Sequence, residues 1–354
     1  MNSRLDPRPL NQSAPSVLIV AAKWWPLSAR LATCFVRAGW RYSGTKSIES
    51  IRQALIDCDS QLVVPCDDGV VTQLHALYAQ DLSLRVLIER SLGPLASYPV
   101  VTSRVKLMQV ARDLGVAVPR FQRIAEQDDL VRWHANIAAG SVVKVDGESG
   151  GNGVRISHSF RESVIAWKRF RAPASYFADW KRLAIDRDPL ALWNRKNSVE
   201  RQVCIQEFIP GRPANSMIAC QNGEVLGIDS VAVVASDGPI GASTIVRRIH
   251  NETMARAARL IAGRLQLNGF YGLDFIIRLA NQHAASHRDE SAVYATRPSG
   301  ICRSMKPRRR IDRALSRRIN TASGNRNSIR SHGILSAGTR LGACMHIAHR
   351  GELS

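Results

Sequence analysis

The sequence has no long apolar run. No stretch approaches the roughly 18 apolar residues that a membrane span needs, and the first apolar run, residues 17–22, is too short for the core of a secretory signal. The seven cysteines form neither a Cys-x-x-Cys pair nor a cluster with histidines at zinc spacing. These absences predict a soluble, cytoplasmic protein with reduced thiols.

Acidic residues are scarce, since 29 Asp and Glu stand against 49 Lys and Arg, for a formal net charge of +20. Residues 281–354 hold 14 Lys and Arg but only 4 Asp and Glu, a net charge of +10. This segment has little hydrophobic periodicity and almost no aromatic side chains to stack on bases, so nucleic acid is not the expected partner. We predict a disordered basic tail. Its alternative explanations are an out-of-frame reading of a lost C-terminal part and a basic arm for RNA or anionic lipid.

Neither of the two common phosphate-binding fingerprints fits the glycine-rich stretch after Lys144, because this lysine precedes the glycines and a strand follows them. Alternating apolar residues on both sides predict two antiparallel strands joined by a flexible loop. Gly147, Gly150, Gly151 and Gly153 allow positive φ and a close approach of backbone N–H groups to an anion. The stretch is a candidate phosphate-binding loop, with a mobile surface loop as the alternative.

The first part of the chain predicts alternating strands and helices. Apolar runs at residues 17–22 and 61–65 read as buried parallel strands, and residues 47–58 fit an amphipathic helix between them. Asp67 and Asp68 follow the second strand, where they either cap the next helix or contact a substrate. This pattern predicts a Rossmann-like N-terminal domain.

After a linker near residue 99 the pattern changes to strand hairpins and longer helices. Residues 103–115 form a helix that begins at a serine cap, and an Asn-Gly turn at 222–223 joins two alternating strands. Residues 252–267 are expected to form a helix with an apolar stripe of Met254, Ala258, Ile261 and Leu265. Asp274 lies in the middle of an apolar strand, where a carboxylate is costly unless it is paired, hydrogen-bonded or metal-bound. Asp274 is therefore a candidate metal ligand, with a satisfied structural carboxylate as the alternative.

Taken in order, these features resemble the ATP-grasp superfamily from about residue 17 to residue 277. The helix with Lys106 resembles the entry to the first ATP-grasp subdomain, and the hairpin with Lys144 resembles the phosphate-covering hairpin. The strand with Asp274 resembles the one that carries a magnesium ligand. The segment that resembles the adenine hinge begins at Gln206 and continues through Glu207, Phe208 and Ile209.

The resemblance implies a mixed α/β and α+β fold, with the Rossmann-like domain followed by a two-subdomain ATP-grasp domain. It also implies ATP and Mg²⁺ as cofactors, with Lys106, Lys144 and the loop N–H groups on the phosphates and backbone groups of the hinge on adenine. A small-molecule carboxylate would become an acyl phosphate, which an amine or another nucleophile attacks. The expected divisions are an arm at 1–15, the first domain at 16–99, the ATP-grasp domain at 100–280 with an insertion at 172–202, and the tail at 281–354.

Arg248 and Arg297 are the candidate catalytic residues, because arginine can meet a phosphate or a substrate carboxylate. A solvated surface arginine is the alternative for Arg248. The family continues with a strand carrying Glu-x-Asn-x-Arg, and Arg297 fits its arginine, but Ala295 and Thr296 stand near the expected carboxylate and amide. This departure keeps an inactive, ATP-binding pseudoenzyme as an alternative. Substrate identity and oligomeric state stay open.

Overall fold

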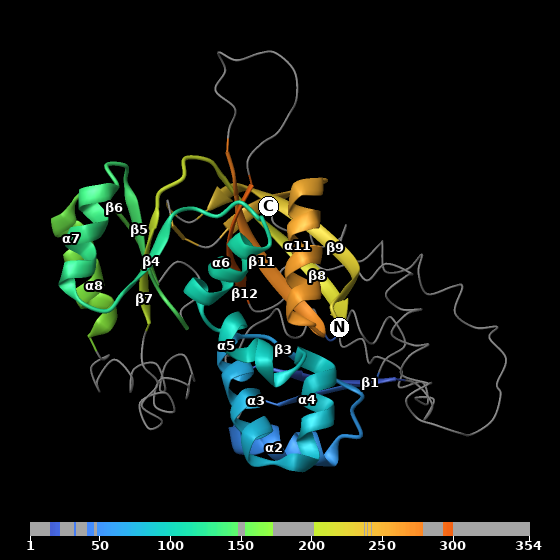
Figure 1. Cartoon of the computed structure of the whole chain (residues 1–354). Coiled ribbons are helices and arrows are strands. Elements are labelled where there is room, and N and C mark those ends of the chain that lie inside the picture. The colour runs from blue at the N-terminus through green and yellow to red at the C-terminus, as the bar shows by residue number, and fades with distance from the viewer. Residues whose placement is uncertain are drawn as a thin grey trace, which may run out of the picture.

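The described part of the computed structural model contains three sheets, each with its own helices (Figure 1). For residues 41–45, 48–50 and 293–299 the structure describes the backbone alone. The predicted arm, the predicted insertion and most of the predicted tail lie outside the described residues. The described residues are 15–21, 32, 41–45, 48–147, 153–172, 202–236, 238, 240–241, 243–278 and 293–299. Among them, no helix combines the length and apolarity that crossing a membrane requires.

The N-terminal sheet is parallel, with the strand order β2-β1-β3. Its strands and helices are β1 (Ser16–Val20), β2 (Arg41–Thr45), α2 (Ile48–Asp57), β3 (Leu62–Pro65), α3 (Asp68–Gln80), η1 (Leu82–Leu84), α4 (Arg85–Leu92), η2 (Leu95–Ser97) and α5 (Tyr98–Val101). All of β1 and β3 is buried, as continuous apolar runs require. Asp67 caps α3 by accepting a hydrogen bond from the Val70 N–H, so the capping interpretation of this aspartate is confirmed.

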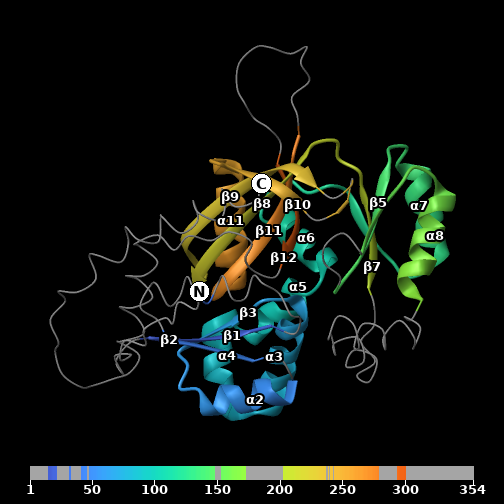
Figure 2. The same cartoon turned by 180° about the vertical axis from the view of Figure 1, so that it is seen from behind.

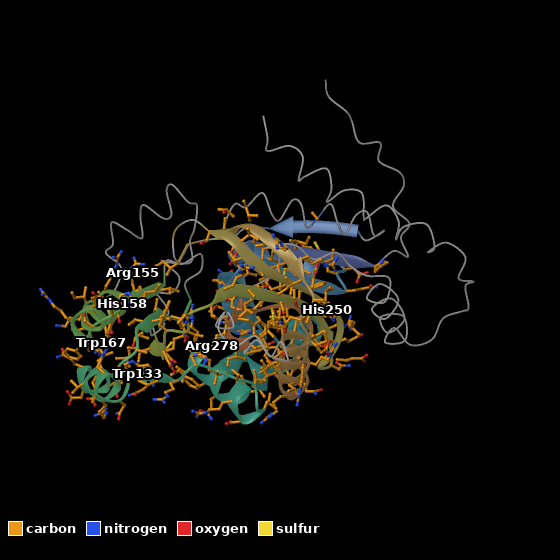
Figure 3. The ribbon with its side chains drawn as sticks, turned by 90° about the horizontal axis from the view of Figure 1, so that it is seen from above. Trp133, Arg155, His158, Trp167, His250 and Arg278 are labelled. Carbon is orange, nitrogen blue, oxygen red and sulfur yellow. The ribbon has the colours of Figure 1, made fainter. Side chains whose placement is uncertain are left out.

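The small antiparallel sheet has the order β4-β7-β5-β6. It consists of β4 (Phe121–Ile124), β5 (Ser141–Val145), β6 (Val154–Ser157) and β7 (Val203–Glu207), and its helices are α7 (Gln127–Asn136) and α8 (Phe160–Arg171). Both helices pack on one face, where Trp133 and Trp167 join the core (Figure 3). Figures 1 and 2 show α7 and α8 on the side of this sheet that faces away from the large sheet.

The large antiparallel sheet has the order β10-β9-β8-β11-β12. Its elements are β8 (Arg212–Gln221), β9 (Glu224–Ser236), β10 (Ser243–Ile249), β11 (Gly269–Ile277) and β12 (Val293–Ser299), with the helices α6 (Arg104–Asp113) and α11 (Glu252–Leu265). Met254, Ala258 and Ile261 of α11 are fully buried against one face, which confirms the predicted helical stripe. Positive φ angles of 47° at Asn222 and 76° at Gly223 confirm the predicted hairpin turn.

Strand β12 falls inside the segment that the sequence assigns to a disordered tail. Six of its seven residues pair with β11 in antiparallel register, and a register shift leaves Thr296 without an opposite residue. For residues 293–299 the prediction of disorder is therefore wrong, because an extended segment can satisfy the backbone groups of the neighbouring strand edge whatever its side chains are.

A seam of hydrogen bonds joins the N-terminal unit to the large sheet. The Tyr271 hydroxyl donates to the Leu92 carbonyl at the end of α4. The Asn268 side chain donates to the Glu89 carbonyl at 2.8 Å. The Leu92 carbonyl lies in the last turn of α4, where carbonyl groups lack a partner within the helix, whereas the Glu89 carbonyl also accepts a hydrogen bond from the Gly93 N–H at 2.8 Å. The seam therefore fixes α4 against β11.

Candidate functional site

The face of the small sheet opposite α7 and α8 carries the predicted phosphate lysine. Val143 and Ile205 belong to the core under the two helices. Because successive side chains in a strand alternate between faces, Lys144, Cys204 and Gln206 belong to the opposite face. Lys144 of β5 lies directly across from Cys204 of β7. We call this face, defined by these last three residues, the open face of the small sheet.

Arg104, in the first turn of α6, is bonded to the end of β5. Its side chain is 4% exposed, and Nη1 donates to Asp146 Oδ1 at 2.9 Å and to the carbonyl oxygen of Val145. The predicted Lys106 lies two residues away on the exposed side of the same turn. The structure thus brings Arg104, which sequence reasoning missed, to the hairpin. The available signal was an arginine directly after the helix cap Ser103.

The Cys204 thiol shows which charges surround this face. Burial raises its pKa to about 11, because a thiolate is poorly stabilised away from water. Arg104 and Lys144 oppose this shift of the pKa, whereas Asp146 adds to it. Two cations and one carboxylate therefore lie close enough to the thiol to affect it, and the thiol is protonated at neutral pH, as expected of a structural cysteine.

The predicted hairpin is present. β5 and β6 pair in antiparallel register, and the Val145 N–H closes the loop by donating to the Gly153 carbonyl at 3.0 Å. Gly147 has a φ of +79°, the left-handed conformation that the sequence predicts for this loop. Gly150 and Gly151 lie outside the described residues. The loop's contact with phosphate stays a prediction.

Two of the three hinge N–H groups that the resemblance assigns to adenine are already engaged. Glu207 N donates to the Arg120 carbonyl at 2.9 Å, and Phe208 N donates to the Gly140 carbonyl at 2.8 Å. Ile209 N has no hydrogen-bond partner within the described part of the chain. A ligand that bonded Ile209 N would therefore displace no hydrogen bond of the described residues.

Gln206 begins the segment that resembles the adenine hinge, but sequence reasoning assigned no role to its side chain. It is 4% exposed, and its Oε1 atom has no hydrogen-bond partner among the described residues. Buried polar atoms are rarely left without a partner, so this oxygen marks a place for a donor that the described residues do not supply. The only sequence signal was a glutamine within an otherwise apolar strand.

A row of residues crosses the large sheet on the face opposite α11. Asp274 of β11 lies across from Asn215 of β8, Asn215 across from Val231 of β9, and Val231 across from Arg248 of β10. Directly opposite residues point to the same face of a sheet. Three strand spacings separate Asp274 from Arg248, or about 14 Å. The predicted metal ligand and the predicted catalytic arginine therefore share a face without being in contact.

Asp274 is hydrogen-bonded in the structure, because Asn215 Nδ2 donates to its Oδ1 at 2.6 Å. Across β12, the backbone of Arg297 lies opposite Asp274, while the side chain of Arg297 lies outside the description. No group of three or more His, Cys, Asp or Glu that could hold a metal occurs among the described residues. The magnesium role of Asp274 stays a prediction.

Arg248 forms an ion pair, with its Nε 2.6 Å from Asp229 Oδ1. The arginine side chain is 52% exposed and the aspartate side chain 11% exposed. The arginine of β10 is thus anchored by a largely buried carboxylate of β9. Figure 3 shows His250, which follows β10, well away from the two tryptophans of the small sheet. The proposed catalytic role of Arg248 stays a prediction.

The arrangement of sheets and helices is the ATP-grasp fold, as the resemblance seen in the sequence implies for the fold. Carboxyaminoimidazole ribonucleotide synthase from Aspergillus clavatus, solved with ATP, matches at a TM-score of 0.55 and 12% identity, over 82% of this chain and 71% of that chain. N5-carboxyaminoimidazole synthetase from Staphylococcus aureus, solved with ADP, matches at 0.51 and 11% over the same shares. Pyruvate carboxylase from Rhizobium etli matches at 0.53 and 14%, over 85% of this chain and 27% of that chain. By sequence alone, no family model and no curated protein matches.

Proposed function

We propose that this protein binds ATP on the open face of the small sheet and uses it to ligate a small-molecule carboxylate. The carboxylate would become an acyl phosphate, which an amine or another nucleophile attacks. The observation that carries the proposal is that Lys144 shares a sheet face with the buried Gln206, whose Oε1 atom has no hydrogen-bond partner among the described residues, while Arg104 is bonded to the end of the same strand, β5. The A. clavatus enzyme of the same fold was solved with ATP and the S. aureus enzyme with ADP, which supports this choice of nucleotide.

The described groups match the two ends of the nucleotide. Adenine presents an amino donor next to a ring acceptor, which would suit Gln206 Oε1 and Ile209 N, with backbone carbonyl groups of Glu207 and Phe208 alongside. Lys144 and Arg104 would bind the phosphates as cations, under the N–H groups of the glycine loop. Lys106 would reach them from the surface of α6.

We propose the predicted domain division for the same reasons, with the N-terminal parallel sheet as a Rossmann-like domain at 16–99. Residues 100–280, with the insertion at 172–202, would form the ATP-grasp domain. The N-terminal domain and the insertion would shape the carboxylate site. We also propose that the protein is cytoplasmic.

The residues around Asp274 fit Mg²⁺, because this ion is usually held by one or two carboxylates together with substrate phosphates. Asp274 would be the protein ligand, and the Asn215 amide would hold its carboxylate in place. Bound Mg²⁺ would offset the charge that develops on the phosphate oxygens. Arg248 and Arg297 would meet the substrate carboxylate or the transferred phosphate.

Lys144→Ala is expected to weaken ATP binding at least tenfold, which corresponds to about 1.4 kcal/mol. The reason is the loss of one of the two cations on the open face. Isothermal titration calorimetry with ATP measures the effect. Lys168→Ala, an exposed lysine on the far side of α8, is the matched control and is expected to bind ATP like the wild type. An unchanged ATP affinity in Lys144→Ala would contradict the proposed site.

A second candidate function is ATP binding without turnover. It rests on β12, whose residues 293–299 include no carboxylate to join Asp274 at a metal site. Magnesium-dependent ADP release across a panel of carboxylates and amines separates the two candidates. The ligase is expected to release ADP with at least one pair of substrates, and ATP binding without any ADP release would favour the inactive form. A protein acting only through its basic tail would show no thermal stabilisation by ATP.

A further inference from the structure

The Asp146 carboxylate is bound by Arg104 in the way that an external anion would be. Its Oδ1 accepts hydrogen bonds from Arg104 Nη1 at 2.9 Å and from the Arg104 backbone N–H at 3.3 Å. The second donor belongs to the first turn of α6, where N–H groups and the helix dipole favour negative charge. The Asp146 side chain is 17% exposed and that of Arg104 is 4% exposed, so the charges lie largely out of water.

This carboxylate sits within the site proposed for the phosphates. Asp146 comes two residues after Lys144 and directly before Gly147, at the start of the loop. Lys144 and Asp146 are two residues apart at the end of β5 and so belong to the same face, and Arg104 Nη1 is 2.9 Å from Asp146 Oδ1. A nucleotide phosphate that approached these two cations would meet a like charge already bonded to one of them.

The hairpin does not depend on this carboxylate for its shape. The Asp146 backbone N–H donates to the Gln202 carbonyl at 2.9 Å, and the Val145 N–H bonds the Gly153 carbonyl across the loop. These backbone bonds fix the end of β5 with or without a charged side chain at position 146. The charge of Asp146 therefore acts chiefly on Arg104.

We propose that Asp146 is an internal competitor for the nucleotide phosphate. It compensates the buried Arg104 guanidinium while the site is empty and gives up that arginine when a phosphate arrives. A buried cation without a counter-charge is strongly destabilising, so the contact with Asp146 stabilises the nucleotide-free protein. The inference rests on the proposed ATP site and adds a residue that lowers affinity for every phosphate-bearing ligand.

Asp146→Asn tests this, because asparagine keeps the size and the acceptor oxygen but removes the charge. By calorimetry, we expect the Kd for ATP and for ADP to fall about tenfold, as removal of a like charge a few ångströms away in a partly buried site allows. Adenosine has no phosphate, so its Kd is expected to stay unchanged. Asp146→Glu, which keeps the charge, is expected to stay near the wild-type affinity for ATP.

Asp81→Asn is the matched control, since Asp81 also accepts a 2.8 Å bond from an arginine, Arg52, and is 14% exposed, but lies in the N-terminal unit. It is expected to leave all three affinities unchanged. If Asp146→Asn folds poorly, Asp146→Ser, another uncharged acceptor, takes its place. Weaker or unchanged ATP binding in a folded, uncharged variant would overturn the competitor role and show that the carboxylate braces the loop. Absence of nucleotide binding to the wild-type protein would instead overturn the proposed function itself.

Discussion

Gly269→Ala is expected to lower the free energy of unfolding by about 3 kcal/mol or more. A Cβ atom added at Gly269 would lie 2.1 Å from the backbone oxygen of Ser91, a distance that no contact tolerates. The φ of Gly269 is also +84°, which strains any side chain. Because the blocking atom belongs to the α4 backbone, relief requires the seam between α4 and β11 to open. Urea unfolding followed by circular dichroism measures the loss.

Gly115→Ala separates the two causes. Gly115 has a similar φ of +72°, but an added Cβ would meet nothing within 4 Å. This variant carries the backbone strain alone, for which about 1 kcal/mol is expected. Equal losses in Gly269→Ala and Gly115→Ala would show that the seam yields to the extra atom and is not rigid.

Acid is expected to destabilise the N-terminal unit through His75. This side chain stacks on Tyr98 with ring centroids 3.5 Å apart, and its Nε2 has no hydrogen-bond partner among the described residues. Burial lowers the pKa of His75 to about 3 from an unfolded value of 6.5, because the cation would lose its hydration. Between these two pKa values the unfolded chain binds a proton that the native protein does not.

The stability contributed by neutral His75 is therefore complete above pH 6.5 and is lost as the pH falls towards 3. Between pH 7.5 and pH 4.5 the linkage amounts to about 3 kcal/mol. His75→Phe preserves the stacking on Tyr98 and is expected to lose about that much less stability than the wild type over this range. Urea midpoints at the two pH values give the comparison.

His158→Phe is the control, because His158 is an exposed residue outside this cluster. It is expected to keep the full pH dependence of the wild type. Since carboxylates also titrate between these pH values, the test is the difference between the variants. Parallel losses of stability in the wild type and in His75→Phe would show that His75 takes up its proton in the folded protein.

The elements that the sequence predicted are those set by local chemistry. The hairpin around Lys144, the Asn-Gly turn at 222–223 and the buried stripe of α11 each depend on residues within one or two turns of chain. In such segments propensity and periodicity agree with the fold. The ATP-grasp resemblance followed because these local features come in the family's order.

The contacts that could not be predicted from the sequence join segments that are far apart along the chain. Arg104 and Asp146 are 42 residues apart, and nothing near either one selects the other. The placement of Asp274 and Arg248 on one face depends on the register of four strands, which the hydrophobic pattern of single strands does not fix. Asp229 was not predicted as the partner of Arg248 because cross-strand neighbours become known only with that register.

The seam between Asn268 and Glu89 has a consequence for the order of events during synthesis. Its two ends are 179 residues apart, so α4 leaves the ribosome long before its partner on β11 exists. At typical elongation rates of roughly 5–20 residues per second, this delay is about 10–35 s. Throughout that interval the last carbonyl groups of α4 and the nearby apolar surface are without their final cover. A chaperone therefore has the longest time to act on this chain while the nascent N-terminal unit waits for β11.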